Sequence, residues 1–401
     1  MKYILGILII LFATYADIFL FRIGIVPLEP ALFLIPLFIV VSVIKYPVID
    51  YLSVFKSHSF KLLAFVLFMS MIYSAFSNAS SEVIIQKISL NLITLLLYLY
   101  IVHFFRTENK QLVVAVAVIG TFVLGGSILY DFFYGLPKHN IDLAMSVRKG
   151  GFGENPNQAA SGVKFLALAS LVYLTKSKTL KYIVIAFMCL TVFMTFSRSG
   201  LVSIILILAF GALNNWNFNF QQEISVLFQR FFKLFLLFAI LYVSLIALAD
   251  VIRENFPEFT RGEAGERLDL LTGKSKSRNM HQGAIEGGRA ELLIDYIDKF
   301  VKNPLGYGTG YSSDKRVNGG MLNTHNYYIY LAVNLSFLTL VAFLVYVYYN
   351  FKLAFQYNQF YYFLFAVMFF LEGFFTHNLF YERSVLVCVA FFDSCIYKKS
   401  A

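Results

Sequence analysis

Apolar runs of membrane-spanning length recur along this chain, separated by short polar connections. A helix needs roughly 20 apolar residues to cross a bilayer, and hydropathy marks about twelve such runs here. Their approximate limits are 3–21, 29–45, 60–77, 83–105, 111–133, 157–175, 180–197, 200–214, 231–250, 325–350, 357–377 and 380–397. The pattern predicts an all-α polytopic membrane protein, because a β-barrel would show short segments of alternating polarity instead.

The composition supports this class. Of the 401 residues, 59% are hydrophobic and 14% charged, and the mean hydropathy is +0.71, whereas about a quarter of a soluble domain is charged. The net charge of +10 lies mostly at the ends of the apolar runs, which argues against binding to nucleic acid. Cys189, Cys388 and Cys395 all fall inside predicted spans, which argues against a disulfide framework or a zinc site. The first apolar run lacks a cleavage site of small residues, and we interpret it as the first span.

Basic residues in the short connections predict the orientation, because Lys and Arg accumulate in cytoplasmic loops. They fall in alternate connections, at Lys45, Lys56, Lys61, Arg106, Lys110, Lys176, Lys178, Lys181, Arg230, Lys233 and Lys352, and near both termini, at Lys2, Lys398 and Lys399. This register predicts cytoplasmic N and C termini. Nine spans occupy residues 1–250, a long outer loop occupies 251–324, and three spans occupy 325–401, together forming one integral membrane domain.

The outer loop contains a predicted amphipathic helix that begins near Arg289. Apolar residues from Leu292 to Phe300 recur at helical spacing with charged residues opposite, and Asn303-Pro304 ends the pattern. Arg289 lies three and four residues before Leu292 and Leu293, which places it on the apolar face. It either binds an anion or reaches lipid headgroups from a helix that lies on the membrane surface.

Two further residues are candidates for chemistry at the outer surface. Arg198 lies in a short break between two spans, where a charge usually faces a cavity or a partner, and a guanidinium suits bidentate contact with phosphate. The alternative is an arginine anchored at the membrane interface. His325, followed by Asn326, opens the next span and is placed to act as a general base. The alternative is a structural, hydrogen-bonded histidine.

Other outer-side residues are candidates for substrate contact. The glycine-rich segment 150–158, with Pro156, predicts a turn and a helix capped by Asn157; a polar lip over the site is the functional alternative to a purely structural turn. The candidates here, beside His325 and in the last outer turn are Arg148, Lys149, Glu154, Asn155, Asn326, His377 and Arg383.

Aromatic and buried polar residues add to these candidates. Tyr307 and Tyr311 offer aromatic faces to a substrate, although most aromatic residues are expected at the lipid and its interfaces. Lys87 and Lys164 lie within spans and are expected to face the interior. Their roles, and that of Glu382, stay open. The sequence contains no Walker loop, HExxH motif, nucleophile elbow or outer acidic pair. We therefore expect no metal or cofactor, and a diphosphate leaving group would then be stabilised by arginines rather than by a metal ion.

The order of these features resembles the O-antigen polymerase and ligase superfamily of bacterial membrane glycosyltransferases. The shared features are about twelve spans, a Ser-Arg turn, a long outer loop late in the chain, and His-Asn at the next span. The resemblance implies a metal-independent, helical GT-C-type fold in the bacterial inner membrane, with its site on the periplasmic face. It also implies that Arg198 matches the family's arginine between spans, Arg289 its outer-loop arginine and His325 its catalytic-loop histidine.

The resemblance implies an inverting glycosyl transfer from undecaprenyl-pyrophosphate-linked oligosaccharide. A polymerase extends a lipid-linked chain, whereas a ligase transfers the finished glycan to lipid A-core. Ligases often carry a second histidine just before the His-Asn pair, and this chain has Leu322-Asn323-Thr324 there, which favours a polymerase. The implied partners are the lipid-linked donor and acceptor, the bilayer, and a chain-length regulator and a flippase of the same pathway.

Two other classes of function remain as alternatives. A transporter or flippase for the same lipids predicts polar groups at the bilayer midplane and repeated broken helices, whereas the unusual residues of this chain gather at one surface. A scaffold without catalysis predicts that Arg198, Arg289 and His325 are individually dispensable.

Overall fold

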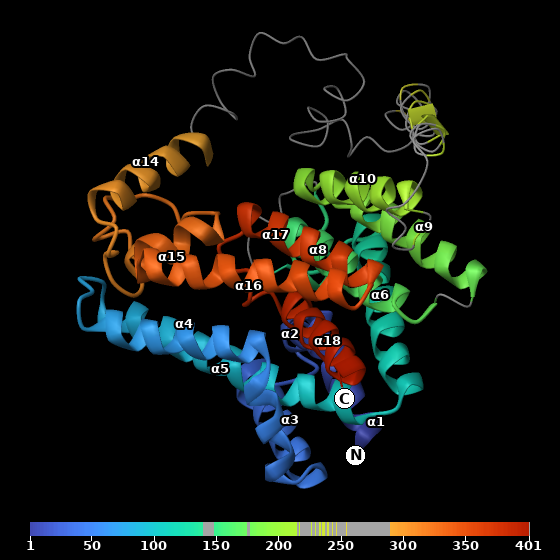
Figure 1. Ribbon diagram of the computed structural model, residues 1–401, viewed down its shortest axis with the longest axis horizontal. Helices are drawn as coiled ribbons and strands as arrows, with labels where there is room; N and C mark the ends of the chain where they lie inside the picture. The colour runs from blue at the N-terminus through green and yellow to red at the C-terminus, as the bar shows by residue number, and fades with distance from the viewer. Residues whose placement is uncertain are drawn as a thin grey trace.

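A computed structural model describes residues 1–138, 148–174, 177–214, 216, isolated positions between 226 and 254, and 289–400. Every regular element in these ranges is helical (Figure 1). The elements are α1 (Lys2–Ala13), α2 (Ala16–Arg22), α3 (Pro30–Lys45), η1 (Val48–Lys56), α4 (His58–Ser74), α5 (Ser81–Thr107), α6 (Lys110–Tyr134), η2 (Gly151–Gly153), α8 (Pro156–Leu171), α9 (Lys178–Met194), α10 (Arg198–Leu213), α14 (Arg289–Lys302), η5 (Tyr311–Ser313), α15 (Tyr327–Leu335), α16 (Phe337–Gln356), α17 (Phe360–Phe375) and α18 (Arg383–Ser400). The predicted all-helical class is confirmed.

Three helices, α5, α6 and α16, are long and apolar enough to cross a membrane. The count rises to five if two bent pairs are each one span: α1 with α2, bent by 74°, and α3 with Ile49–Lys56, bent by 113°. Helices α4, α10 and α17 are apolar but shorter. The described residues thus support a membrane protein without confirming twelve spans. Most of the predicted span 231–250, and the outer loop up to residue 288, lie outside the described residues.

The helix connections gather at two opposite ends of the bundle. At one end, Arg22, the last residue of α2, forms an ion pair with Glu154 before α8, with 2.8 Å between Nε and Oε1. At the other end, the hydroxyl of Tyr46 after α3 donates a hydrogen bond of 2.7 Å to Glu108 after α5. Both termini lie near this second end, and Figure 1 shows them close together. The two ends match the two sets of connections that the basic residues predicted. Which end faces the outside stays a prediction.

Helix α8 forms the centre of the bundle. Every residue from Ala159 to Leu171 is buried, and the helix packs against α6, α9, α10, α17 and α18. A Cβ atom on Gly162 would lie 2.6 Å from the side chain of Ser384, so the glycine permits close approach of α18. The N-terminus of α8 therefore lies in the middle of the first end, which we name the site end.

The predicted span 325–350 is wrong as a single helix. The ring of Tyr327, at the start of α15, lies 5.0 Å from the ring of Phe343 in α16, measured between centroids. In one continuous helix these residues would be about 24 Å apart. Helix α15 therefore folds back against α16 as a hairpin, and only α16 has the length of a span. All residues of α15 except Ile329 are buried.

The bend between α15 and α16 has local and long-range causes. Ser336 has φ 89°, outside the helical region. The chain that follows α14 supplies backbone partners there: Phe337 N–H donates to the Pro304 carbonyl at 3.0 Å, and Tyr307 N–H donates to the Val333 carbonyl at 2.7 Å. Hydropathy alone does not reveal the break, because residues on both sides of it are apolar.

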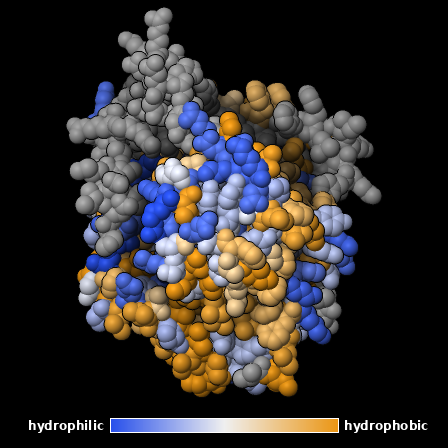
Figure 2. Space-filling model, turned by 90° about the vertical axis from the view of Figure 1, so that its left-hand side faces the viewer, coloured by the Kyte–Doolittle hydropathy of each residue, from blue (hydrophilic) through white to orange (hydrophobic). Residues whose placement is uncertain are grey.

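Helix α14 confirms the predicted amphipathic helix, which begins at Arg289 and ends before Asn303-Pro304. Its Leu292 and Tyr296 are buried against Tyr311 and Val333, so part of its apolar face packs on protein. Figure 2 shows the site end from outside, with hydrophilic side chains gathered in its upper part and apolar side chains below. Besides Arg289, the charged residues of α14 are Glu291, Asp295, Asp298, Lys299 and Lys302.

Candidate functional site

A polar cavity of about 100 Å³ opens at the N-terminus of α8. It is lined by side chains from four parts of the chain: Asn155, Asn157 and Gln158 at the start of α8; Ser199 at the start of α10; His325 before α15; and Glu372, Phe375, Thr376, His377, Asn378 and Glu382 from α17 and the following turn. The cavity is thus assembled from segments far apart in the sequence, all of which end at the site end.

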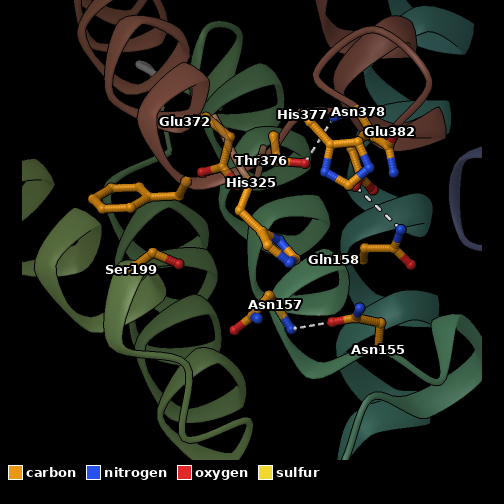
Figure 3. A pocket seen from close by; sticks show the side chains of 11 residues that line it. Asn155, Asn157, Gln158, Ser199, His325, Glu372, Thr376, His377, Asn378 and Glu382 are labelled. Atoms are coloured by element: carbon orange, nitrogen blue, oxygen red, sulfur yellow. Dashed lines mark hydrogen bonds between the residues drawn. The ribbon is translucent and has the colours of Figure 1, made fainter. Parts of the chain in front are cut away.

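His325 lies in the middle of this cavity. Figure 3 shows its ring directed toward Asn157 and Gln158, with Ser199 to one side. Its backbone has φ 47°, in the left-handed region that a bulky residue rarely occupies, and strain of this kind is often found at functional sites. The side chain of the next residue, Asn326, accepts a hydrogen bond of 3.1 Å from Ile329 N–H and caps α15. The structure therefore gives His325 a place in the cavity and Asn326 a structural role.

A second histidine packs against the first. The rings of His325 and His377 meet edge to face, with 5.5 Å between centroids. His377 lies in the turn between α17 and α18, and its Nδ1 has no hydrogen-bond partner among the described residues. Burial, together with the charges of His325 and Lys87, lowers the pKa of His377 to about 3. His377 is therefore neutral at neutral pH.

Two carboxylates also face the cavity. The hydroxyl of Tyr15 donates a hydrogen bond of 3.0 Å to Oε2 of Glu382, and the amide of Gln158 donates one of 3.1 Å to Oε1. Burial raises the pKa of Glu382 to about 7, although these two hydrogen bonds lower it. Glu372 forms a buried ion pair with Lys164, which also donates a hydrogen bond of 3.0 Å to Ser203 Oγ.

Comparison with known proteins bears on this site. The sequence model of the O-antigen ligase family matches residues 183–344, a range that includes Arg198, Arg289 and His325. This match supports the resemblance of the chain to the O-antigen polymerase and ligase superfamily. The match covers less than half of the chain, and a search of curated proteins gave no match. The resemblance expected from the sequence is confirmed, and members of this family are membrane glycosyltransferases and ligases.

The cavity extends beyond the segment that carries the family match. Gln158 precedes that segment, and Glu372, His377 and Glu382 follow it. The sequence pattern singled out His377 and left Glu382 open, but it missed Glu372 and Gln158. One signal in the sequence could have found Glu372. It is an acidic residue inside one predicted span, and the basic residue Lys164 lies inside another, so the two could have been predicted to pair.

The helix cap at α8 differs from the prediction. Asn155, and not Asn157, is the cap: its side chain accepts a hydrogen bond of 2.9 Å from Asn157 N–H, and Pro156 takes the first helical position. Oδ1 of Asn157 instead accepts hydrogen bonds from Ser197 Oγ at 2.9 Å and from Arg148 Nη2 at 2.8 Å. These bonds tie the Ser-Arg turn to the wall of the cavity.

The arginines occupy different positions from His325. Arg198 begins α10 and is exposed, while its neighbour Ser199 lines the cavity. The side chain of Arg289 lies outside the described residues. Lys149 is half-buried beside Arg148 and does not line the cavity. The structure thus brings His325 and His377 into contact, and the turn that contains Arg198 lies at the same cavity.

Other predicted contact residues have partners within the protein. Glu154 pairs with Arg22, as described above. Nη1 of Arg383 donates hydrogen bonds of 2.7 Å to both carboxylate oxygens of Asp17. Both pairs join the end of the first helices to the centre of the bundle.

The tyrosines after α14 also pack internally. The rings of Tyr307 and Tyr311 stack on each other at 4.5 Å, and Lys299 of α14 donates a hydrogen bond of 2.7 Å to the Tyr311 hydroxyl. These contacts hold α14 on the loop beneath it, and neither tyrosine is part of the cavity lining.

Proposed function

We propose that this protein is an O-antigen polymerase, or a polymerase of a related surface polysaccharide, with its active site at the site end. One observation carries the proposal: His325, within the segment that matches the family, stands in the middle of a polar cavity beside a neutral histidine. A half-buried imidazole with open space before it suits a general base. The site end would face the periplasm, across the bacterial inner membrane.

The proposed reaction is a single inverting displacement. An acceptor sugar hydroxyl attacks the anomeric carbon of the lipid-linked donor. A bond forms between the acceptor oxygen and that carbon, the bond from that carbon to the diphosphate oxygen breaks, and the hydroxyl proton passes to His325. The lipid diphosphate leaves, held by Arg198 and Arg289, and charge-assisted contacts of this kind strengthen as charge develops on the leaving group.

An O-antigen ligase remains a second candidate because His377 contacts His325. The absence of a histidine in 322–324 favours a polymerase by sequence, yet His377 supplies a second imidazole 5.5 Å from His325 in space. The ligase would use the same donor and the same base, with lipid A-core as the acceptor. The two candidates therefore differ in the acceptor and not in the chemistry at His325.

The test uses purified full-length protein in lipid with undecaprenyl-pyrophosphate oligosaccharide as the sole substrate. A ladder of longer lipid-linked products identifies a polymerase, whereas product that forms only when lipid A-core is added identifies a ligase. Movement of the lipid across the membrane without bond formation would identify a transporter and contradict the proposal. Turnover should persist in excess EDTA, because the proposed leaving-group stabilisation comes from arginines.

A further inference from the structure

The side chains that line the cavity at His325 suit sugar hydroxyl groups better than phosphate. Among the described residues of the lining, none is Lys or Arg. Four are amides, Asn155, Asn157, Gln158 and Asn378, and an amide both donates and accepts hydrogen bonds, as a sugar hydroxyl does. A diphosphate is instead bound by the charged forks and ammonium groups of Arg and Lys.

Glu382 is held in a fixed position in the wall of this cavity. It is 5% exposed, and both of its oxygens accept hydrogen bonds, from Tyr15 and from Gln158. The break between α1 and α2, at which Tyr15 has φ 61°, turns the tyrosine toward Glu382. A carboxylate has about four acceptor positions, so Glu382 retains acceptor capacity for a ligand hydroxyl.

The two carboxylates differ in how their charge is compensated. Glu372 is paired with Lys164, so that pair has no net charge. Both hydrogen-bond donors to Glu382 are neutral groups. An anionic group of a ligand about 6 Å from an ionised Glu382 would lose roughly a hundredfold in affinity, at an effective dielectric constant of about 20.

We propose that this cavity is the subsite for the acceptor sugar, that it takes an uncharged pyranose, and that Glu382 excludes acidic sugars such as uronic acids. The proposal rests on the proposed glycosyl transfer, because His325 must meet the acceptor hydroxyl. The donor diphosphate then lies outside the cavity, on the side of Arg198, which is exposed at the start of α10. The same arrangement gives Glu382 a role in specificity and His325 the role of base.

The experiment compares two acceptors that differ only in the terminal sugar, glucose or glucuronic acid, on full-length protein in lipid at pH 8. The wild-type protein should prefer the neutral acceptor by about a hundredfold in kcat/KM. Glu382→Gln should reduce this preference at least tenfold, chiefly through KM for the acidic acceptor, and Glu382→Asp, which keeps the charge, should retain it. Donor affinity should stay unchanged in both variants.

Glu108→Gln is the matched control. Glu108 is also a buried glutamate with a tyrosine donor, Tyr46, but it lies at the opposite end of the bundle. The control should leave the acceptor preference unchanged. Equal use of both acceptors by the wild-type protein, or an unchanged preference in Glu382→Gln, overturns the subsite.

A binding measurement separates the subsite from the proposed function. Methyl glucoside and methyl glucuronide are titrated against the same proteins, with saturation-transfer NMR as the readout. If turnover occurs and Glu382→Gln discriminates as the wild type does, the subsite is wrong and the function stands. If neither acceptor turns over, but methyl glucoside binds and Glu382→Gln gains binding of methyl glucuronide, the subsite stands and the function is wrong.

Discussion

Two cations at the site end are compensated by ion pairs, whereas a third, the buried Lys87, is not. Arg383 pairs with Asp17, and Lys164 pairs with Glu372. Lys87 on α5 is 8% exposed, and among the described residues it has neither a carboxylate partner nor a hydrogen bond. Its ammonium group lies 5.9 Å from the ring centre of Tyr330. A buried charge without a partner lowers stability.

Lys87→Met and Lys164→Met should therefore change stability in opposite directions. Removal of the unpaired cation at Lys87 should raise the free energy of unfolding by about 1–3 kcal/mol, because methionine needs no solvation of a charge. Lys164→Met should lower it by roughly 3–5 kcal/mol, because it leaves Glu372 buried without its partner. Thermal unfolding of both variants in the same detergent measures the difference. A loss of stability in both would mean that the contact of Lys87 with the ring of Tyr330 outweighs the cost of burying its charge.

Substitutions of His325 and of Arg198 should impair different parts of the reaction. His325→Ala should lower turnover by about 10²–10⁴-fold and leave donor binding intact, because a general base acts on the acceptor hydroxyl. Arg198→Lys should lower turnover by roughly 10²–10³-fold, because lysine keeps the charge but loses the planar fork.

Arg316→Lys serves as the control for the arginine, because Arg316 is a mostly exposed residue that pairs with Asp314 on the loop. It should leave turnover near the wild-type value. Donor binding and turnover are measured on all three variants after thermal unfolding confirms that they fold. Normal turnover in His325→Ala would move the base elsewhere, with His377 as the next residue to change.

At the scale of elements, breaks in helices position the site. The break between α1 and α2 brings Tyr15 to Glu382, and the bend at Ser336 turns α15 back so that its N-terminus meets the α17–α18 turn. The loop between α14 and α15 covers the end of α4 and the start of α5. There Thr309 donates a hydrogen bond of 2.7 Å to the Ser70 carbonyl, and Asp314 accepts one of 2.9 Å from Ser80 N–H.

Gly308→Ala should destabilise this loop more than Gly319→Ala does. Both glycines have positive φ, 102° at Gly308 and 83° at Gly319, so an alanine is strained at each position. This backbone strain costs about 1 kcal/mol of stability for a residue with a Cβ atom. Only at Gly308 would the new Cβ also meet backbone, 2.5 Å from Ser77 Cα, while no atom of the described residues lies within 4 Å of a Cβ at Gly319. Overpacking of this kind costs a further 1–3 kcal/mol or so. Equal unfolding temperatures for the two variants would contradict the close contact between this loop and the α4–α5 turn.

At the scale of the whole molecule, the two ends of the bundle fix which residues can act together. The polar cavity, the α4–α5 turn and the loop after α14 all lie at the site end, and the chain termini lie at the opposite end. The excess of basic residues in the connections of the opposite end predicts that this end faces the cytoplasm.

Single cysteines test that orientation. Lys315 lies in the loop at the site end and Lys178 at the start of α9 at the other end, and both are exposed. In intact cells, Lys315→Cys should react with an impermeant maleimide, and Lys178→Cys should react only after the membrane is opened. The native cysteines are replaced first, because Cys189 and Cys395 are half-buried. Labelling in the reverse pattern would place the cavity on the cytoplasmic side and contradict a periplasmic active site.

Local patterns in the sequence determined the helical class, most helix limits, the two sets of connections, helix α14 and the family resemblance. Hydropathy and helical periodicity depend on neighbouring residues, which explains why Arg289 and Asn303-Pro304 marked the ends of α14 correctly. The Ser-Arg turn and His325 were also visible, since a polar residue between apolar runs stands out locally.

Only the tertiary structure decided which of these residues meet. The hairpin at Ser336 needs backbone partners near Pro304, and the carboxylate of Glu382 needs a hydroxyl from Tyr15, 367 positions away in the sequence. Glu372 lines the cavity and pairs with Lys164 of another helix. Arg383 instead pairs with Asp17 and is not part of the cavity lining. Such contacts depend on how helices pack, and packing is set by the shapes of distant side chains, which no local pattern contains.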